Sequence, residues 1–407
     1  MKVAVIGGGA SGLFAAGLLT KAGIETYIFD GNEKLGKKIY ITGKGRCNVT
    51  NNCDKDGYLK NVVHGQKFMY SAINQFDSQD TIEFFESLGC PLKTERGGRV
   101  FPCSDKASDV TKTLVKNIDN NFLDLHLNEK VVTIDKKSNF AIKTEKSKYE
   151  FDAVIVATGG KSYSATGSSG DGYKFAKMFD LNVVTPSAAL VPIKIKDSFC
   201  SNLEGLSLKN VQLNAVVNGK TKSLFGEMMF THDAITGPIA LSLSSFIGNN
   251  KDIELSLDFK PALTNEKLEE RILRDFKDNL NKDISYIIKG LLPHRLTEIF
   301  LNCCGIDKHK KVNSITVAER NKIIYNLKNF ALSFSGLYPI ESGIVTAGGV
   351  DLKEINPKTM ESKKVPDLYF IGEVLDVDCL TGGYNLQTAF STAYAAANAI
   401  ILKNSKV

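Results

Sequence analysis

Histidine and paired cysteine motifs are scarce in this chain of 407 residues. It has five histidines and eight cysteines, but no Cys-x-x-Cys pair and no Cys/His quartet. A structural zinc site and a disulfide framework therefore both lack support, and we expect no metal. Reduced thiols fit a cytoplasmic protein, which is our expectation for its location.

Long apolar runs and a strong charge bias are missing as well. No stretch approaches the roughly 18 apolar residues that a membrane-spanning helix needs, so no membrane partner is expected. The apolar start, Val3 to Leu19, resembles a signal peptide, but three consecutive glycines interrupt it. The net charge is 51 − 45 = +6, too mild for a dedicated nucleic-acid binder, so a nucleic-acid partner is not expected.

The N-terminal third alternates short β-branched runs with helical patterns, which predicts an α/β fold with a parallel sheet. Strands are expected at 2–6, 25–29, 131–134 and 154–156, and helices at 10–22 and 80–88. Gly89 is the expected stop of the second helix.

The pattern changes after about residue 185, which indicates an inserted domain. Residues 211–217 alternate before Asn218-Gly219, a strong hairpin signal in an expected antiparallel β unit. A helical block follows, with Leu268, Ile272, Phe276 and Leu280 on one stripe and a capping box at Thr316 to Glu319. We predict domain borders at 1–187, 188–341 and 342–407, in which the third segment completes the first.

The chain opens with a strand that runs into Gly7-Gly8-Gly9-Ala10-Ser11-Gly12, the G-x-G-x-x-G spacing, and then a helix. Gly7 allows a tight turn, Gly9 lets the backbone approach a pyrophosphate, and Gly12 permits close helix packing. Asp30, 18 residues beyond Gly12, ends the second strand, where a carboxylate accepts hydrogen bonds from ribose hydroxyls. This context predicts dinucleotide binding.

Two later segments extend the expected cofactor site. Val154 to Gly160 is a buried strand that ends in small residues, and Gly372-Glu373 follows another strand. Gly382-Gly383 then opens an alanine-rich helix, whose N-terminus would favour an anionic reduced flavin. These pieces predict FAD rather than NAD alone. No second fingerprint is present, so NAD(P)H would visit the flavin only transiently.

Several longer strings carry a family resemblance, and they lie at residues 35–38, 41–51, 98–102, 106–110, 226–232, 292–296 and 346–387. With these strings the chain resembles the BaiN-like, aminoacetone-oxidase-like NAD(P)/FAD-dependent flavoproteins along nearly its whole length. The resemblance implies a Rossmann-like, two-dinucleotide-binding-type FAD domain with an inserted β-barrel plus helical domain.

The resemblance also implies a set of FAD-contacting residues. These are Gly7, Gly9, Ala10, Ser11, Gly12, Asp30, Lys38, Arg46, Cys47, Asn48, Val131, Ala157, Thr158, Gly159, Gly372, Glu373, Asn385, Leu386 and Gln387. The chain departs from the family at two places where similar proteins usually show glycine, Cys379 and Ala234. If the turn at Cys379 needs positive φ, it is strained here.

Three further features are candidates for chemistry. His232 is a candidate proton donor, with a structural role as the alternative. Arg99 could clamp an anionic substrate or a flavin oxygen, and a surface ion pair is its alternative. Cys47 and Cys53 could form a flavin-linked redox pair, although their spacing argues against it. Arg46 either contacts the cofactor or pairs with a carboxylate.

The expected function is FAD-dependent hydride transfer through flavin N5, with the insert covering the substrate side. The resemblance implies NAD(P)H-linked reduction of an activated C=C bond in a small steroid- or bile-acid-like substrate. Oxidation of an amine such as aminoacetone by O2 is one alternative. FAD-dependent tRNA modification is another, suggested by the basic pI of about 8.7. The oligomeric state is not predicted.

Overall fold

The computed structural model describes residues 1–405, and contacts divide the chain into two compact units. Unit 1 runs from Met1 to Ala189 and resumes at Ile340, whereas unit 2 is the continuous segment Leu190–Pro339. Each unit has its own buried apolar core. Among residues 1–405, no helix is long and apolar enough to cross a membrane.

A five-stranded parallel sheet lies at the centre of unit 1, with the order β21-β11-β1-β2-β7. Its strands are β1 (Lys2–Ile6), β2 (Glu25–Asp30), β7 (Leu123–Leu127), β11 (Ala153–Val156) and β21 (Leu368–Phe370). All four residues of β11 are buried, as in a strand covered on both faces. The expected Rossmann-type α/β class is therefore confirmed.

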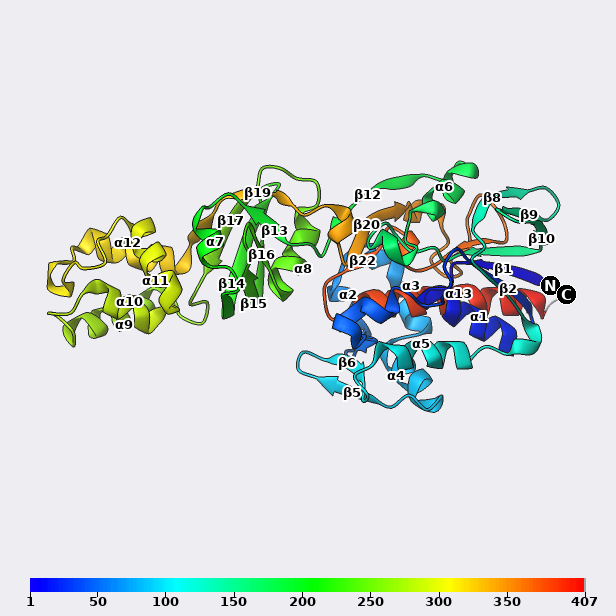
Figure 1. The fold of residues 1–407 in the computed structure, drawn as a ribbon, viewed down its shortest axis with the longest axis horizontal. Helices are drawn as coiled ribbons and strands as arrows, with labels where there is room; N and C mark the ends of the chain where they lie inside the picture. Colours follow the sequence, from blue (N-terminus) through cyan, green and yellow to red (C-terminus); the bar gives the residue numbers. More distant parts are fainter. Residues whose placement is uncertain (406–407) are drawn as a thin grey trace. The chain divides into compact units, whose positions relative to one another are not determined.

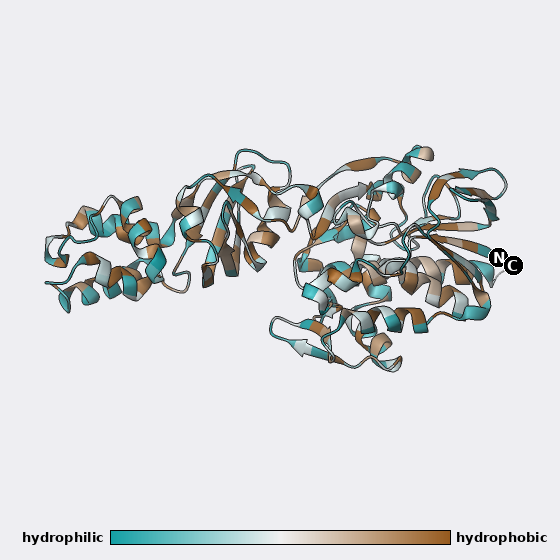
Figure 2. Cartoon of the chain, in the orientation of Figure 1, coloured by the Kyte–Doolittle hydropathy of each residue, from teal (hydrophilic) through white to brown (hydrophobic). Residues whose placement is uncertain are grey.

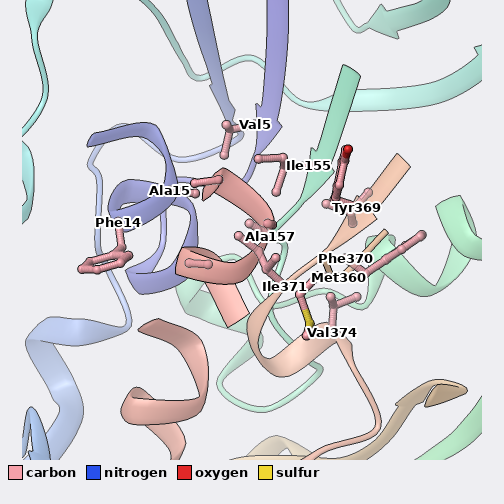
Figure 3. Packing of buried hydrophobic residues seen from close by; sticks show 14 of the residues in the cluster. Val5, Phe14, Ala15, Ile155, Ala157, Met360, Tyr369, Phe370, Ile371 and Val374 are labelled. Atoms are coloured by element: carbon pink, nitrogen blue, oxygen red, sulfur yellow. The ribbon is translucent and has the colours of Figure 1, made fainter. Parts of the chain in front are cut away.

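Helices α1 (Ala10–Lys21) and α13 (Tyr384–Asn404) lie against each other beside this sheet (Figure 1). Small buried residues such as Ala16 and Ala396 allow the two backbones to approach closely. Figure 3 shows Phe14 and Ala15 of α1 in the same buried cluster as Val5 of β1. The other α-helices of unit 1 are α2 (Lys55–Lys60), α3 (Gln66–Gln75), α4 (Ser78–Ser87), α5 (Ala107–Lys116) and α6 (Asp171–Met178).

Four smaller sheets complete unit 1. Two are three-stranded, in the orders β10-β9-β8 and β3-β6-β5, and two are the pairs β12-β20 and β22-β4. Their bounds are β3 (Thr50–Asn51), β4 (Val62–His64), β5 (Leu92–Glu95), β6 (Arg99–Pro102), β8 (Val131–Lys136), β9 (Phe140–Thr144), β10 (Lys148–Phe151), β12 (Val183–Ala189), β20 (Val345–Val350) and β22 (Asp378–Cys379).

Two sequence expectations for unit 1 need correction. The strand expected at 131–134 belongs to β8, which pairs antiparallel with β9 instead of joining the parallel sheet. The helix expected at 80–88 is α4, which begins at Ser78 because Asp77 caps it and forms a capping box with Asp80. It ends at Ser87, and Gly89 follows at φ +85°.

Unit 2 contains a seven-stranded antiparallel sheet with the order β18-β17-β14-β15-β16-β13-β19. Asn218 and Gly219 join β14 to β15 with φ values of +50° and +72°, which confirms the expected tight hairpin. The strands are β13 (Ile193–Ile195), β14 (Ser207–Val217), β15 (Lys220–Phe230), β16 (Ala234–Thr236), β17 (Glu254–Asp258), β18 (Phe330–Leu332) and β19 (Phe334–Leu337).

The α-helices of unit 2 are α7 (Phe199–Asn202), α8 (Pro238–Ile247), α9 (Asn265–Lys277), α10 (Ile284–Leu291), α11 (His294–Cys304) and α12 (Val317–Lys328). Apolar and polar patches alternate along α9 to α12 (Figure 2), as expected for helices that bury one face. Leu268, Ile272 and Phe276 are buried on α9. The expectation for Leu280 is wrong, because it lies beyond the end of α9 and is 51% exposed.

Candidate active site

The turn from β1 into α1 has the geometry of a phosphate cradle. Gly7 has φ +108°, and a Cβ there would lie 2.4 Å from the carbonyl oxygen of Ala157. A Cβ on Gly12 would lie 1.9 Å from the Gly7 oxygen, so neither glycine tolerates a side chain. A Cβ on Gly9 would meet no atom of the described chain within 4 Å. Backbone atoms of the protein therefore pack closely against Gly7 and Gly12, whereas the space beside Gly9 is open.

The start of α1 is free of a side-chain cap. Its N-cap residue is Gly9, and no side chain of the described residues bonds to the first turn. The first N–H groups of a helix need acceptors, and the helix dipole favours an anion at this end. Ala10 and Ser11 form this first turn, so the cradle fits a pyrophosphate.

Asp30 lies at the end of β2 and is held beside the glycine turn. Its Oδ2 accepts a hydrogen bond from the Gly8 N–H at 2.8 Å. Its Oδ1 accepts from the backbone N–H and the side-chain Nδ2 of Asn32, at 2.8 and 2.9 Å. The Asn32 amide also reaches the Thr166 carbonyl oxygen at 3.2 Å. Asn32 is not predicted from the sequence, although an asparagine two residues after this carboxylate is a recognisable turn signal.

The Ala157-Thr158-Gly159 segment follows β11 and passes behind the glycine turn. The Thr158 hydroxyl and the hydroxyl of Tyr173 on α6 are both buried without a hydrogen-bond partner in the described residues. Burial, with Glu373 and Asp376 nearby, raises the pKa of Tyr173 well above its ordinary value. Buried polar atoms without partners are rare, so these hydroxyls fit a site completed by a bound polar molecule.

Gly372 brings the end of β21 to the same place. A Cβ on Gly372 would lie 2.7 Å from the Ser11 hydroxyl, so this loop touches the first turn of α1. The Gly372 N–H donates to the Thr392 hydroxyl of α13 at 3.0 Å. Three predicted segments from distant parts of the sequence therefore meet at one end of the parallel sheet.

Lys38 and Glu373 pair with each other within unit 1. The Lys38 Nζ lies 2.8 Å from Glu373 Oε2 and 2.7 Å from the Ser162 hydroxyl. The other carboxylate oxygen accepts from Ser162 and from the Thr346 backbone N–H, at 3.0 and 2.9 Å. Both residues are predicted FAD contacts, and the structure brings them together in one cluster that joins four segments.

The first turn of α13 is clamped to β22. Asn385 Oδ1 accepts from the Cys379 N–H and Nδ2 donates to the Cys379 oxygen, each at 3.0 Å. Cys379 is buried in a strand and is not among the residues with positive φ, so the expected strain is absent. Ala234, the other departure from glycine, is likewise buried in β16 without positive φ.

The side chains of Gln387 and Leu386 contact other residues of unit 1. The Gln387 side chain is fully buried, and its oxygen accepts from the hydroxyls of Thr50 and Thr81 at 2.6 and 2.8 Å. Its nitrogen donates to the Ser391 hydroxyl at 3.0 Å. Leu386 packs against the core of unit 1. The Gln387 side chain is therefore already satisfied by the protein.

Arg46 pairs with carboxylates. Its guanidinium contacts Glu95 and Asp105 and lies 4.2 Å from the centre of the Phe101 ring. This is the structural alternative that the sequence left open. The neighbouring Asn48 Oδ1 accepts from the Val100 N–H at 3.1 Å, which ties the same loop to β6.

Cys47 is fully buried, and burial raises the pKa of its thiol to about 12. It has φ +59°, an uncommon conformation for a residue other than glycine. Cys47 and Cys53 are both free thiols, and burial also raises the pKa of Cys53. Since the thiolate is the reactive form, these thiols lack the property of a redox pair.

Three further predicted residues are Val131 and Arg99 in unit 1 and His232 in unit 2. Val131 starts β8 and is 4% exposed. Arg99 starts β6, and its Nε donates to the Arg96 carbonyl oxygen at 3.1 Å. His232 belongs to unit 2; its side chain is 76% exposed and lies 3.7 Å from Glu204. The cofactor contact predicted for Val131 and the catalytic roles predicted for Arg99 and His232 stay predictions.

Comparison with known proteins agrees with this geometry. The family model described as HI0933-like protein Rossmann domain matches residues 1–399. The chain is 33% identical to a ribosomal RNA dihydrouridine synthase of Haemophilus influenzae, over 97% of both chains. It is 30% identical to a 3-dehydro-bile acid delta(4,6)-reductase of Clostridium scindens, over 98% of both chains.

A solved structure shares the fold. It is the 3-ketosteroid delta1-dehydrogenase of Sterolibacterium denitrificans, with a TM-score of 0.52 and 13% identity, over 98% of this chain and 99% of the other. The glycine cradle, the carboxylate at the end of β2 and the full-length family match lead to the same conclusion. The chain belongs to the HI0933-like, BaiN-like Rossmann flavoprotein family and is an FAD-dependent oxidoreductase.

Proposed function

We propose that the protein uses FAD, with NAD(P)H as the electron donor, to saturate a carbon–carbon double bond conjugated to a carbonyl group. The observation that carries the proposal is the cradle at the start of α1. There backbone atoms fill the space beside Gly7 and Gly12, the space beside Gly9 is open, and no side chain of the described residues caps the helix. Two full-length relatives have names that describe the reduction of such a bond.

The residues of unit 1 would hold FAD in four places. The first turn of α1, Gly9 to Gly12, would bind the pyrophosphate, and Asp30 would accept from ribose hydroxyls. Thr158 would complete its missing hydrogen bond at the cofactor. The uncapped start of α13 at Gly383 would stabilise negative charge on the flavin ring. When bound, FAD supplies the hydride chemistry, and the protein supplies position and electrostatics.

A small steroid-like enone is the first candidate substrate. It is the expectation from the sequence, and it fits the relative named as a bile-acid reductase. Uridine in ribosomal RNA is the second candidate, because the relative at 33% identity is named for it. In both molecules the reduced bond is conjugated to a carbonyl, which accepts the electron density that hydride addition pushes toward it.

The proposal is tested by incubating the holoenzyme with NADH or NADPH and either a 3-oxo-4-ene steroid or uridine-containing ribosomal RNA. Mass spectrometry should show the gain of two hydrogens in one of the two substrates, and only with a pyridine nucleotide present. Oxidation of aminoacetone with O2 consumption, and no reduction of either double bond, would overturn the proposal in favour of an amine oxidase.

A further inference from the structure

A histidine–aspartate pair lies in unit 1 outside the residues described above. His64 ends β4, and its Nδ1 lies 2.5 Å from Oδ1 of Asp378 in β22. The two residues are direct partners in the antiparallel pairing of these strands. Asp378 is completely buried, whereas the His64 side chain is 50% exposed. The pair therefore connects a buried carboxylate to an imidazole that outside molecules can reach.

Asp378 is not satisfied as a structural residue would be. Its second oxygen, Oδ2, is buried without a hydrogen-bond partner in residues 1–405. A buried carboxylate that served only packing would be expected to have partners on both oxygens, since burying an unpaired polar atom is costly. The His64 side chain is the partner that the structure gives to this carboxylate.

The local backbone fixes the pair beside the start of α13. Cys379, the residue after Asp378, is bonded through both its N–H and its oxygen to Asn385 in the first turn of α13. On the other strand, the Asn61 oxygen accepts from the Leu380 N–H at 2.9 Å. Gly65 has φ +83°, and a Cβ there would lie 2.8 Å from Val377, so the chain turns sharply right after His64. The imidazole is thus placed by a rigid segment next to the helix start assigned to the flavin.

We propose that His64 is the proton donor of the reduction, and that Asp378 positions it. With Nδ1 held by Asp378, Nε2 is the atom left to give a proton to substrate. This inference rests on the proposed function, because it needs a double bond that accepts both a hydride and a proton.

One carbon of the double bond would gain a hydride, which reduced FAD held by the α1 turn and Asp30 would supply, and the electron pair of the π bond would move toward the conjugated carbonyl. The other carbon takes the proton from His64 Nε2, so two C–H bonds replace the π bond. The neutral imidazole then regains a proton from water, and the pyridine nucleotide restores the two electrons.

The electrostatics suit a donor. The hydrogen bond with Asp378 raises the pKa of His64, and the charges of Asp378 and Asp376 add to that effect despite partial burial. Burial raises the pKa of Asp376. The charge of His64 lowers this pKa, and the charges of Asp378 and Asp351 raise it further. Carboxyl groups are the charged neighbours that act on the imidazole, so its protonated form is favoured up to a higher pH than usual.

The first test compares His64→Gln with His309→Gln in the holoenzyme. His309 is a matched control: it is also exposed and lies 3.4 Å from an aspartate, Asp283, but it belongs to unit 2. Stopped-flow absorbance measures flavin reduction by NAD(P)H and reoxidation by the double-bond substrate separately. For H64Q, reoxidation should fall by about 10²- to 10⁴-fold while reduction by NAD(P)H stays unchanged. H309Q should change neither step.

The outcomes separate this inference from the proposed function. H64Q reoxidised as fast as wild type, in an enzyme that does reduce the double bond, overturns the role of His64 alone. Wild-type flavin that no conjugated double bond reoxidises overturns the proposed function, and the inference with it. Loss of bound flavin or of thermal stability in H64Q would show a structural role instead and would also overturn the inference.

A second readout does not depend on turnover. The chain has five histidines, so the imidazole NMR signals of the holoprotein can be assigned by the signal that H64Q removes. The His64 pKa should lie above the ordinary value of a histidine, and Asp378→Asn should lower it because the hydrogen bond and charge of the carboxylate are lost. An unchanged His64 pKa in D378N would overturn the role of Asp378. If D378N does not fold, the basic limb of the wild-type reoxidation rate must coincide with the measured His64 pKa, and a mismatch overturns the inference.

Discussion

Two glycines in the turn from β1 into α1 have different roles, because one is needed for folding and the other for cofactor binding. Gly12 contacts the Gly7 backbone, whereas Gly9 has extended backbone at φ −83° and faces open space. Gly9→Ala should leave the apoprotein as stable as wild type to within about 1 kcal/mol, because alanine tolerates that backbone. It should nevertheless bind FAD at least tenfold more weakly, since the new methyl group occupies the path of the pyrophosphate.

Gly12→Ala is the matched variant and should fail differently. Its methyl group would overlap the Gly7 oxygen, so the free energy of unfolding should fall by about 1–3 kcal/mol even without FAD. Urea unfolding of both apoproteins, together with flavin fluorescence titration, checks the pair. An equally stable G12A, or a G9A with full FAD affinity, would contradict these assignments.

Asp171 at the start of α6 gives a pH dependence. Burial raises its pKa, but hydrogen bonds from Lys130, Lys174 and Ser169 outweigh burial and hold it at about 2. A lowered pKa stabilises the fold above the unfolded value of about 4 and loses this effect as the pH falls toward 2. Asp171→Asn should therefore cost about 1 kcal/mol at pH 7 and progressively less below pH 4. Urea unfolding across that pH range checks this; a cost independent of pH would contradict it.

At the residue scale, the sequence predicted the fingerprint well and the side-chain partners poorly. The roles of Gly7, Gly9 and Gly12 follow from spacing, since backbone geometry is local. The pairing of Lys38 with Glu373 joins residues 335 positions apart, and no local pattern shows it. The same is true of Arg46 with Glu95 and of His64 with Asp378, because each depends on which strands become neighbours.

Among the elements, α12 provides a direct test of a predicted cap. The Thr316 hydroxyl accepts from the Glu319 N–H at 3.2 Å, and the Glu319 carboxylate accepts from the Thr316 N–H at 2.9 Å. Thr316→Ala should lower the free energy of unfolding by about 1 kcal/mol, and Thr316→Ser should recover most of it. Denaturant unfolding of the two variants tests this. Equal stabilities would show that the cap contributes nothing.

Element types were predicted better than element partners. The capping box and the Asn218-Gly219 turn are local signals, and both appear in the structure as expected. Residues 131–134 were predicted as a strand, yet β8 joins a separate antiparallel sheet. The sheet that a strand joins depends on its partner strands, here at residues 140–151, as much as on the residues of the strand itself. Leu280 continues the four-residue spacing of the apolar positions, but helix α9 ends before it, at Lys277.

At the scale of the whole molecule, unit 1 is expected to fold without unit 2, because each unit has its own buried core. Ala189 pairs with Val345 across β12 and β20, so the two ends of unit 1 that flank the insert are close neighbours. Replacing residues 190–339 with a short glycine-rich linker should therefore leave a protein that folds and binds FAD. Whether turnover of the double-bond substrate survives then reports whether unit 2 takes part in the reaction.

Flavin absorbance, circular dichroism and the steady-state rate of that deletion variant check both parts. A variant unable to bind FAD would contradict the independence of unit 1. Full turnover in the variant would remove the insert from the reaction.

Anaerobic stopped-flow absorbance of the flavin in two mixes tests the reduction of the double bond most directly. The holoenzyme is first reduced with NADH or NADPH, and is then mixed with a 3-oxo-4-ene steroid or with uridine-containing ribosomal RNA. One of the two substrates should restore the oxidised flavin spectrum without oxygen, with one equivalent of saturated product. A flavin that stays reduced with both substrates and is reoxidised only when air is admitted would contradict it.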